Sequence, residues 1–178
     1  MIGLNAKQRD WTVAVIYILF IYFTLPIMPG IWKKLNSFSE SLANLLPVTL
    51  LVTAGVFIIM HLVFSRKSAF SFISLAILWF IYSLGLSTIK LPVEKIHFIE
   101  YSFLAILVFR ALRHNFEGRV IYLWSSLAVF ILGCIDEVIQ YFLPNRVYDL
   151  RDVLINGFAG VLGLALLGFC LEPRGLQG

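Results

Sequence analysis

Acidic residues, a histidine and amide side chains recur at helical spacing in the second half of this sequence. His97 precedes Glu100 by three positions, so the two side chains share one face of a helix. Asp136 and Glu137 lie four and three positions before Gln140, so both carboxylates can reach that amide. Carboxylates beside imidazole and amide groups can move protons or hold a divalent cation. The spacing therefore predicts acid–base or metal-assisted chemistry.

A stripe of polar and small residues follows a short polar segment. Asp149, Asp152, Asn156 and Gly160 are separated by 3, 4 and 4 positions, which places them on one helix face. Arg146 lies just before this stripe and could hold a phosphate or carboxylate through two hydrogen bonds. The predicted catalytic residues, with His97 or Glu100 as general base, are His97, Glu100, Asp136, Glu137 and Asp152. The predicted substrate-binding residues are Gln140, Arg146, Asp149 and Asn156. A divalent metal ion is a possible cofactor, with candidate ligands Glu100, Asp136, Glu137, Asp149 and Asp152.

Several of these residues also have a simpler explanation. Asp149 and Asp152 could cap a helix N-terminus and complement its dipole. Arg146 could contact lipid phosphates, and Asn156 could bond a neighbouring helix. His97 alone could be an interfacial histidine. Ionisable residues clustered within a membrane protein are usually functional, so the combination favours a site over coincidence.

The composition places these residues in a membrane protein. The chain has 178 residues, of which 60% are hydrophobic and 13% charged, and its mean hydropathy is +0.91. Soluble domains are about 45–50% apolar and about 25% charged. Too few polar side chains exist to cover a soluble surface, which excludes a soluble enzyme, a DNA-binding domain and a disulfide-rich secreted module. Cys134 and Cys170 lie in apolar runs and are expected to be small buried hydrophobes. Membrane lipid is the expected partner, and nucleic acid is not.

Long apolar runs predict the helices that position the site. About 20 apolar residues span a bilayer as a helix, whereas barrel strands are about 10 residues long and alternate in polarity. Residues 31–44 carry apolar side chains at helical spacing among lysines and serines, which is typical of an interfacial helix. The predicted fold is an all-α integral membrane protein, a single domain over residues 1–178 with an interfacial helix after the first span. Its six predicted transmembrane helices are 11–29, 45–65, 69–89, 96–112, 120–143 and 153–171.

The distribution of charge predicts the orientation in the plasma membrane. With both termini in the cytoplasm, eight basic residues lie inside: Lys7, Arg9, Arg66, Lys67, Arg110, Arg113, Arg119 and Arg174. Six lie outside: Lys33, Lys34, Lys90, Lys95, Arg146 and Arg151. The outer face then also holds six of the ten acidic residues: Glu94, Glu100, Asp136, Glu137, Asp149 and Asp152. The other four, Asp10, Glu40, Glu117 and Glu172, are expected to be solvated at helix ends or in loops.

The same residues carry a resemblance to a known family. Segment 94–101, EKIHFIEY, resembles the DK-x-x-H-x-x-E-Y signature of VanZ-like membrane proteins, with Glu94 where the family more often has aspartate. Segment 136–152 is similar to that family's DE-x-x-Q-x-F-x-P-x-R-x-x-D-x-x-D block, and Asn156 and Gly160 follow as they do there. The resemblance covers about residues 90–170. It implies a small multi-helix membrane protein, and the name-giving member is associated with resistance to the glycopeptide teicoplanin.

Three functions remain open at this point. The first is an enzyme at the outer membrane surface that acts on a lipid-linked envelope substrate such as an undecaprenyl phosphate intermediate. No serine or cysteine nucleophile is evident in the cluster, and no HExxH or GxSxG pattern occurs, so an acid–base or metal-assisted reaction is preferred to a covalent one. The second is a non-catalytic binder of a lipid headgroup, a glycopeptide or a partner protein. The third, an ion-coupled transporter, is less favoured because no internal repeat is evident.

Overall fold

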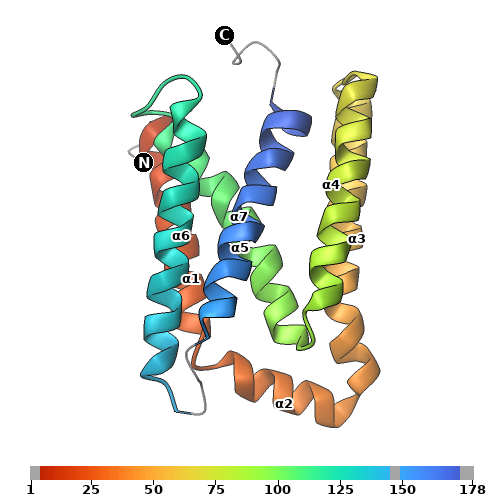
Figure 1. The fold of residues 1–178 in the computed structure, drawn as a ribbon, viewed down its shortest axis with the longest axis vertical. Coiled ribbons are helices and arrows are strands. Elements are labelled where there is room, and N and C mark those ends of the chain that lie inside the picture. Colours follow the sequence, from red (N-terminus) through yellow and green to blue (C-terminus); the bar gives the residue numbers. More distant parts are fainter. Residues whose placement is uncertain (1–4, 145–148, 173–178) are drawn as a thin grey trace.

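Helices make up nearly all of the part of the chain that the computed structural model describes, residues 5–144 and 149–172 (Figure 1). Within these residues no strand occurs, which confirms the all-α class. The elements are α1 (Ala6–Thr24), α2 (Met28–Phe38), α3 (Glu40–Phe64), α4 (Ala69–Thr88), α5 (Pro92–Leu112), α6 (Val120–Tyr141), α7 (Leu150–Leu166) and a π-helical turn, η1 (Leu167–Leu171).

The first helix begins earlier than predicted because its N-terminus is capped. The Asn5 side chain accepts a hydrogen bond from the Gln8 backbone N–H, and the Gln8 side chain accepts one from the Asn5 backbone N–H. This reciprocal capping satisfies two N–H groups that the helix itself leaves without partners. Helix α1 therefore starts at Ala6, five residues before the predicted start, and ends at Thr24.

The predicted interfacial helix is present as α2, which bends away from α1 by 63°. It crosses one end of the bundle (Figure 1). The prediction of residues 31–44 was wrong at both ends, since α2 runs from Met28 to Phe38. Ser39 breaks the helix with an extended backbone, and its hydroxyl accepts from the Leu42 N–H to cap α3. Residues 40–44 consequently open the next membrane-spanning helix.

Composition supports fewer independent spans than the six predicted. Within the described residues, α3, α4, α6 and the continuous α7–η1 segment are long and apolar enough to cross a membrane. The bent pair α1 and α2 makes a fifth span if it is counted as one. Helix α5 does not qualify, because its 21 residues contain the charged side chains Glu94, Lys95, Glu100 and Arg110.

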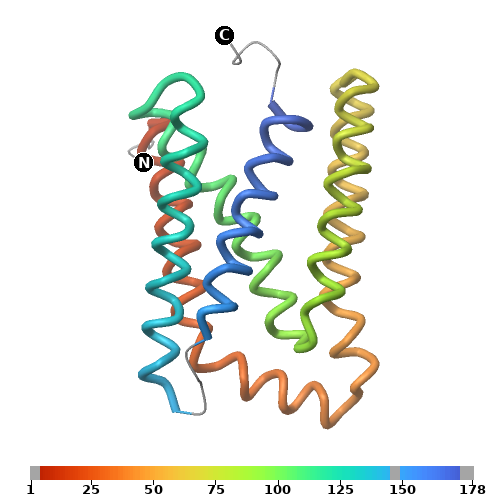
Figure 2. Tube along the Cα trace, in the orientation of Figure 1, coloured from red at the N-terminus to blue at the C-terminus, as the bar shows by residue number. Residues whose placement is uncertain are grey.

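Helix α5 tolerates these charges because it lies inside the bundle. It packs against α7, α6, α1 and α3, and its trace runs diagonally behind α7 (Figure 2). Phe98, Tyr101, Leu104 and Ala105 on α5 are almost fully buried in the largest apolar core cluster of the described chain. The His97 and Glu100 side chains of α5 are thus largely shielded by neighbouring helices, where their solvation cost can be offset by hydrogen bonds, whereas Arg110 near the end of the helix is exposed.

The two ends of the bundle differ in charge. The six acidic residues 94, 100, 136, 137, 149 and 152 belong to the start of α5, the end of α6 and the start of α7, which meet at the end crossed by α2 (Figure 1). The opposite end holds the start of α1, the end of α5 and the start of α6. The six acidic residues therefore lie at one end of the bundle, as their order in the sequence predicted.

Asp10 departs from the expectation of a solvated charge. Its side chain is only 4% exposed, at the end of the bundle opposite the acidic cluster. His114 contacts it at 2.9 Å between Nε2 and Oδ2. The expectation failed because α1 and α5 pack side by side, which the positions of these residues in the sequence do not reveal.

Candidate functional site

A small pocket opens among α5, α6 and α7 at the acidic end of the bundle. Its volume is about 10 Å³, close to the space that one water molecule needs. Three helices contribute side chains to it, so it depends on their packing rather than on one local motif. The lining residues are Glu94, His97, Glu137, Gln140, Asp152, Ile155 and Asn156.

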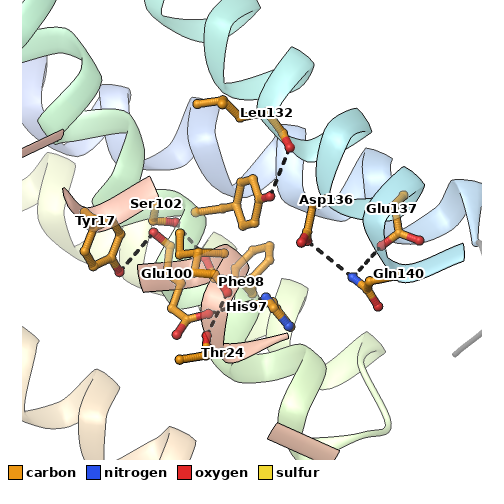
Figure 3. A network of polar contacts seen from close by, with 12 residues as sticks. Tyr17, Thr24, His97, Phe98, Glu100, Ser102, Leu132, Asp136, Glu137 and Gln140 are labelled. Carbon is orange, nitrogen blue, oxygen red and sulfur yellow. Dashed lines mark hydrogen bonds and ion pairs between the residues drawn. The ribbon is translucent and has the colours of Figure 1, made fainter. Parts of the chain in front are cut away.

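The Gln140 amide joins two buried carboxyl groups of α6. Its Nε2 donates to Glu137 Oε1 at 3.1 Å and to Asp136 Oδ2 at 3.3 Å, and in Figure 3 the amide lies between the two carboxyl groups. Asp136 and Glu137 are both almost completely buried. Hydrogen bonds from an amide reduce the cost of burying carboxyl groups, so this contact supports the wall of the pocket.

Glu137 also connects α6 to the start of α7. Its Oε2 accepts the Asp149 backbone N–H at 3.1 Å. The Asp149 side chain is exposed and accepts the Arg151 backbone N–H at 2.8 Å, which makes Asp149 the N-cap of α7. The capping explanation therefore accounts for the Asp149 side chain, which does not line the pocket. Its backbone, held by Glu137, fixes the helix that carries Asp152 and Asn156.

His97 and Glu100 meet as their three-residue spacing predicts. The distance from His97 Nδ1 to Glu100 Oε2 is 3.3 Å, and both side chains are largely buried. Tyr17 of α1 reaches the same turn, and its hydroxyl is 3.5 Å from the Glu100 carbonyl oxygen (Figure 3). A carboxylate that orients an imidazole is the arrangement that general bases use. The pair thus brings an imidazole and a carboxyl group together beside the pocket.

Tyrosine hydroxyls extend the polar network away from the pocket, and the sequence did not predict most of them. Tyr22 of α1 and Tyr101 of α5 lie 3.0 and 3.4 Å from the Leu132 carbonyl oxygen on α6. Tyr101 also lies near the Asp136 side chain. Tyr101 shares the face of His97 at four-residue spacing, which is a usable signal. Tyr22 carries no such signal, because its partner is 110 positions away.

The nine residues predicted for the site do not all reach the pocket. Five of them line it: His97, Glu137, Gln140, Asp152 and Asn156. Glu100 and Asp136 lie next to it through their contacts with His97 and Gln140. Arg146 lies outside the described residues. Glu94 lines the pocket although it was not assigned to the site, and its three-residue spacing from His97 could have identified it.

The predicted carboxylates gather without forming a metal-binding group. Among the residues that the structure describes, no three histidine, cysteine or acidic side chains are placed to hold a metal ion. Among the candidate ligands, Glu100 instead contacts His97, Asp136 and Glu137 contact Gln140, and Asp149 caps α7. Asp136, Asp149 and Asp152 are close enough to Glu137 to repel its charge. The pocket is therefore acid-rich and attracts cations and hydrogen-bond donors.

This fold and pocket define a class of protein: a helical, multi-pass membrane protein with an acid-rich polar pocket at one end of its bundle. The VanZ/LLP1 family model matches residues 11–171 of the chain. The chain therefore belongs to the VanZ/LLP1 family, and the match extends well beyond residues 90–170, where the motifs lie. Comparisons with curated proteins and with solved structures gave no match.

Proposed function

We propose that the pocket binds a group rich in hydrogen-bond donors, a sugar or an ammonium group, on a lipid-linked cell-envelope molecule or a glycopeptide. The observation that carries this proposal is the lining of the pocket. Glu94, Glu137 and Asp152 supply carboxylates, Gln140 and Asn156 supply amides, and the described lining contains no lysine or arginine. Such a lining attracts hydroxyl and ammonium donors and repels a bare phosphate.

The pocket's position supports a ligand that is anchored in the membrane. Its walls are parts of helices whose outer faces are apolar, with Val138 on α6 and Leu154 on α7 about half exposed. A lipid tail can lie along such faces while its polar head reaches the pocket. Because the pocket has room for only about one water molecule, the head would occupy its mouth. The teicoplanin association of the family's name-giving member agrees with a ligand from the cell envelope.

Exchanging Asp152 for asparagine is expected to weaken binding of a sugar-bearing lipid. A hydrogen bond to a charged group contributes about 1.5–3 kcal/mol, so Asp152→Asn should raise the dissociation constant of undecaprenyl-phosphate-linked sugar roughly tenfold or more. Undecaprenyl phosphate without the sugar should bind weakly to both proteins. Native mass spectrometry of the purified proteins measures both constants. Glu40→Gln is the matched control, because Glu40 is also an acidic residue in the first turn of a helix at this end. Equal binding of the lipid with and without its sugar would refute the proposal.

Catalysis at the same pocket is a second candidate, favoured by the His97–Glu100 contact. A histidine oriented by a carboxylate can take a proton from a bound hydroxyl group, or from water attacking the ligand. Catalysis differs from binding alone because the protein would convert the sugar-bearing lipid into a different molecule. Chromatography of the sugar-bearing lipid after incubation with the protein distinguishes the two, since unchanged lipid leaves only the binding function.

The proposed ligand requires the acidic end to face outward, with both termini in the cytoplasm. Cysteines at Lys33 and at Asn115 test this orientation, because both positions are exposed at opposite ends of the bundle. In a Cys134→Ala/Cys170→Ala background, a membrane-impermeant thiol reagent added to whole cells should label Lys33→Cys only. Both should react after the cells are permeabilised. Labelling of Asn115→Cys alone in whole cells would place the pocket in the cytoplasm and rule out an external ligand.

A further inference from the structure

A basic cluster surrounds the buried Asp10 carboxylate at the end of the bundle opposite the pocket. Asp10 Oδ2 is 2.9 Å from His114 Nε2 and 3.6 Å from Arg113 Nη2. Its Oδ1 is 3.7 Å from both Arg110 Nη2 and Arg9 Nε. One carboxylate therefore faces three guanidinium groups. With His114 neutral, the three positive charges less one negative charge leave the cluster at +2.

The guanidinium groups keep hydrogen-bonding capacity for a further anion. Their distances to Asp10 exceed those of ordinary charge-assisted hydrogen bonds, which are about 2.7–2.9 Å. Between 44% and 61% of the side-chain surface of Arg9, Arg110 and Arg113 is exposed, whereas Asp10 is buried beneath them. The carboxylate thus draws the three arginines together without using all their N–H donors.

A pocket beside this cluster gives an anion a place to bind. Arg9, Asp10, Val13, Leu107 and Arg110 line it between α1 and α5. Its volume of about 80 Å³ is several times the space that one water molecule needs, so a phosphate group fits. Two arginines lie at this pocket, and two apolar side chains, one of them the exposed Val13, form its other wall.

The helix dipoles explain only part of the cluster. Arg110 and Arg113 lie at the C-terminal end of α5, where positive charge is favourable. Arg9 lies near the N-terminal end of α1, where the dipole opposes a cation. The dipole of α1 therefore does not explain Arg9, whose favourable charge interaction among the described residues is its contact with Asp10.

We propose that this cluster is a binding site for an anionic phospholipid, with the lipid phosphate on Arg9 and Arg110 and the first carbons of its chain on Val13 and Leu107. The apolar wall makes a lipid the better occupant than free phosphate, since a soluble anion gains nothing from it. The site is separate from the acid-rich pocket and does not depend on the function proposed there.

The test is phosphatidylglycerol binding to the purified full-length protein, measured by native mass spectrometry with phosphatidylcholine as the neutral comparison. Arg110→Gln should raise the phosphatidylglycerol dissociation constant about fivefold, and Arg9→Gln, which alters a mostly exposed side chain, should do the same. Arg66→Gln is the matched control, because it removes one positive charge at the same end but outside the cluster, and should leave the constant unchanged.

Glycerol phosphate, added as a soluble competitor, shows whether the site prefers the phosphate of a phospholipid or a soluble phosphate. It should displace phosphatidylglycerol only at concentrations far above those of the lipid, because it lacks the chain that contacts Val13 and Leu107. Displacement at equal concentrations would overturn the assignment to a lipid. Equal weakening by Arg66→Gln, or no preference for phosphatidylglycerol over phosphatidylcholine, would overturn the site itself.

Discussion

Gly163→Ala is expected to destabilise the helix bundle and to disturb the pocket. A Cβ at position 163 would lie 2.2 Å from the Ser102 carbonyl oxygen and 2.9 Å from the Ser102 Cα. These are backbone atoms of α5, so no side chain can rotate away and α7 must move. Overpacking of this kind costs about 1–3 kcal/mol, occasionally more. A lower melting temperature in detergent, followed by circular dichroism, measures the effect.

The reason for this sensitivity is the close approach of α5 and α7. Ser102 Oγ donates to the Ala159 carbonyl oxygen at 2.8 Å across the same contact, and small residues allow helix backbones to approach so closely in membranes. Gly30→Ala is the matched control, since a Cβ at position 30 in α2 meets no atom within 4 Å. It should leave the melting temperature unchanged or raise it slightly. Equal effects of the two variants would show that the α5–α7 crossing is looser than described.

Glu137→Gln is expected to weaken both the α6–α7 contact and the pocket. The carboxylate accepts two hydrogen bonds, from the Gln140 amide and from the Asp149 backbone N–H. A glutamine has one acceptor oxygen and can keep only one of them, while its amide nitrogen faces a second donor. Leaving a buried donor without a partner costs about 1–3 kcal/mol.

This loss should also change the pocket, because Glu137 lines it and its side chain accepts the Asp149 backbone N–H at the start of α7. The first turns of α7 carry Asp152 and Asn156, which line the pocket opposite Glu137. We therefore expect Glu137→Gln to lower the denaturation midpoint and to weaken binding of the sugar-bearing lipid more than tenfold. Glu117→Gln, an exposed residue at the other end of the bundle, should change neither measurement.

Local spacing predicted much of the site because its contacts are largely local. The pairs His97–Glu100 and Glu137–Gln140 are three positions apart on single helices, and both contacts are present. The apolar runs likewise predicted the helices, since lipid requires long uninterrupted stretches of apolar residues. The order of the predicted helices alone was enough to place the six acidic residues at one end of the bundle.

Contacts between distant helices could not be predicted in this way. The burial of Asp10 depends on how α1 packs against α5, and its partner His114 is 104 positions away. Asp149 was predicted either to bind substrate or to cap a helix. These two roles differ only in where its side chain points, and spacing along the sequence does not determine that direction. The apolar run 96–112 predicted helix α5 as one more span. Its charged residues are compatible with a membrane only where neighbouring helices surround it, and the sequence does not show which helices do so.

The acid-rich pocket is proposed to bind the polar head of an envelope lipid. The most direct measurement is titration of undecaprenyl-phosphate-linked sugar into the native protein, Glu137→Gln and Glu117→Gln, with helicity checked by circular dichroism. If the proposed function holds, we expect the native protein and Glu117→Gln to bind the lipid equally and a still-helical Glu137→Gln to bind it at least roughly tenfold more weakly. Equal affinity of all three proteins would contradict the claim and leave the pocket a purely structural network.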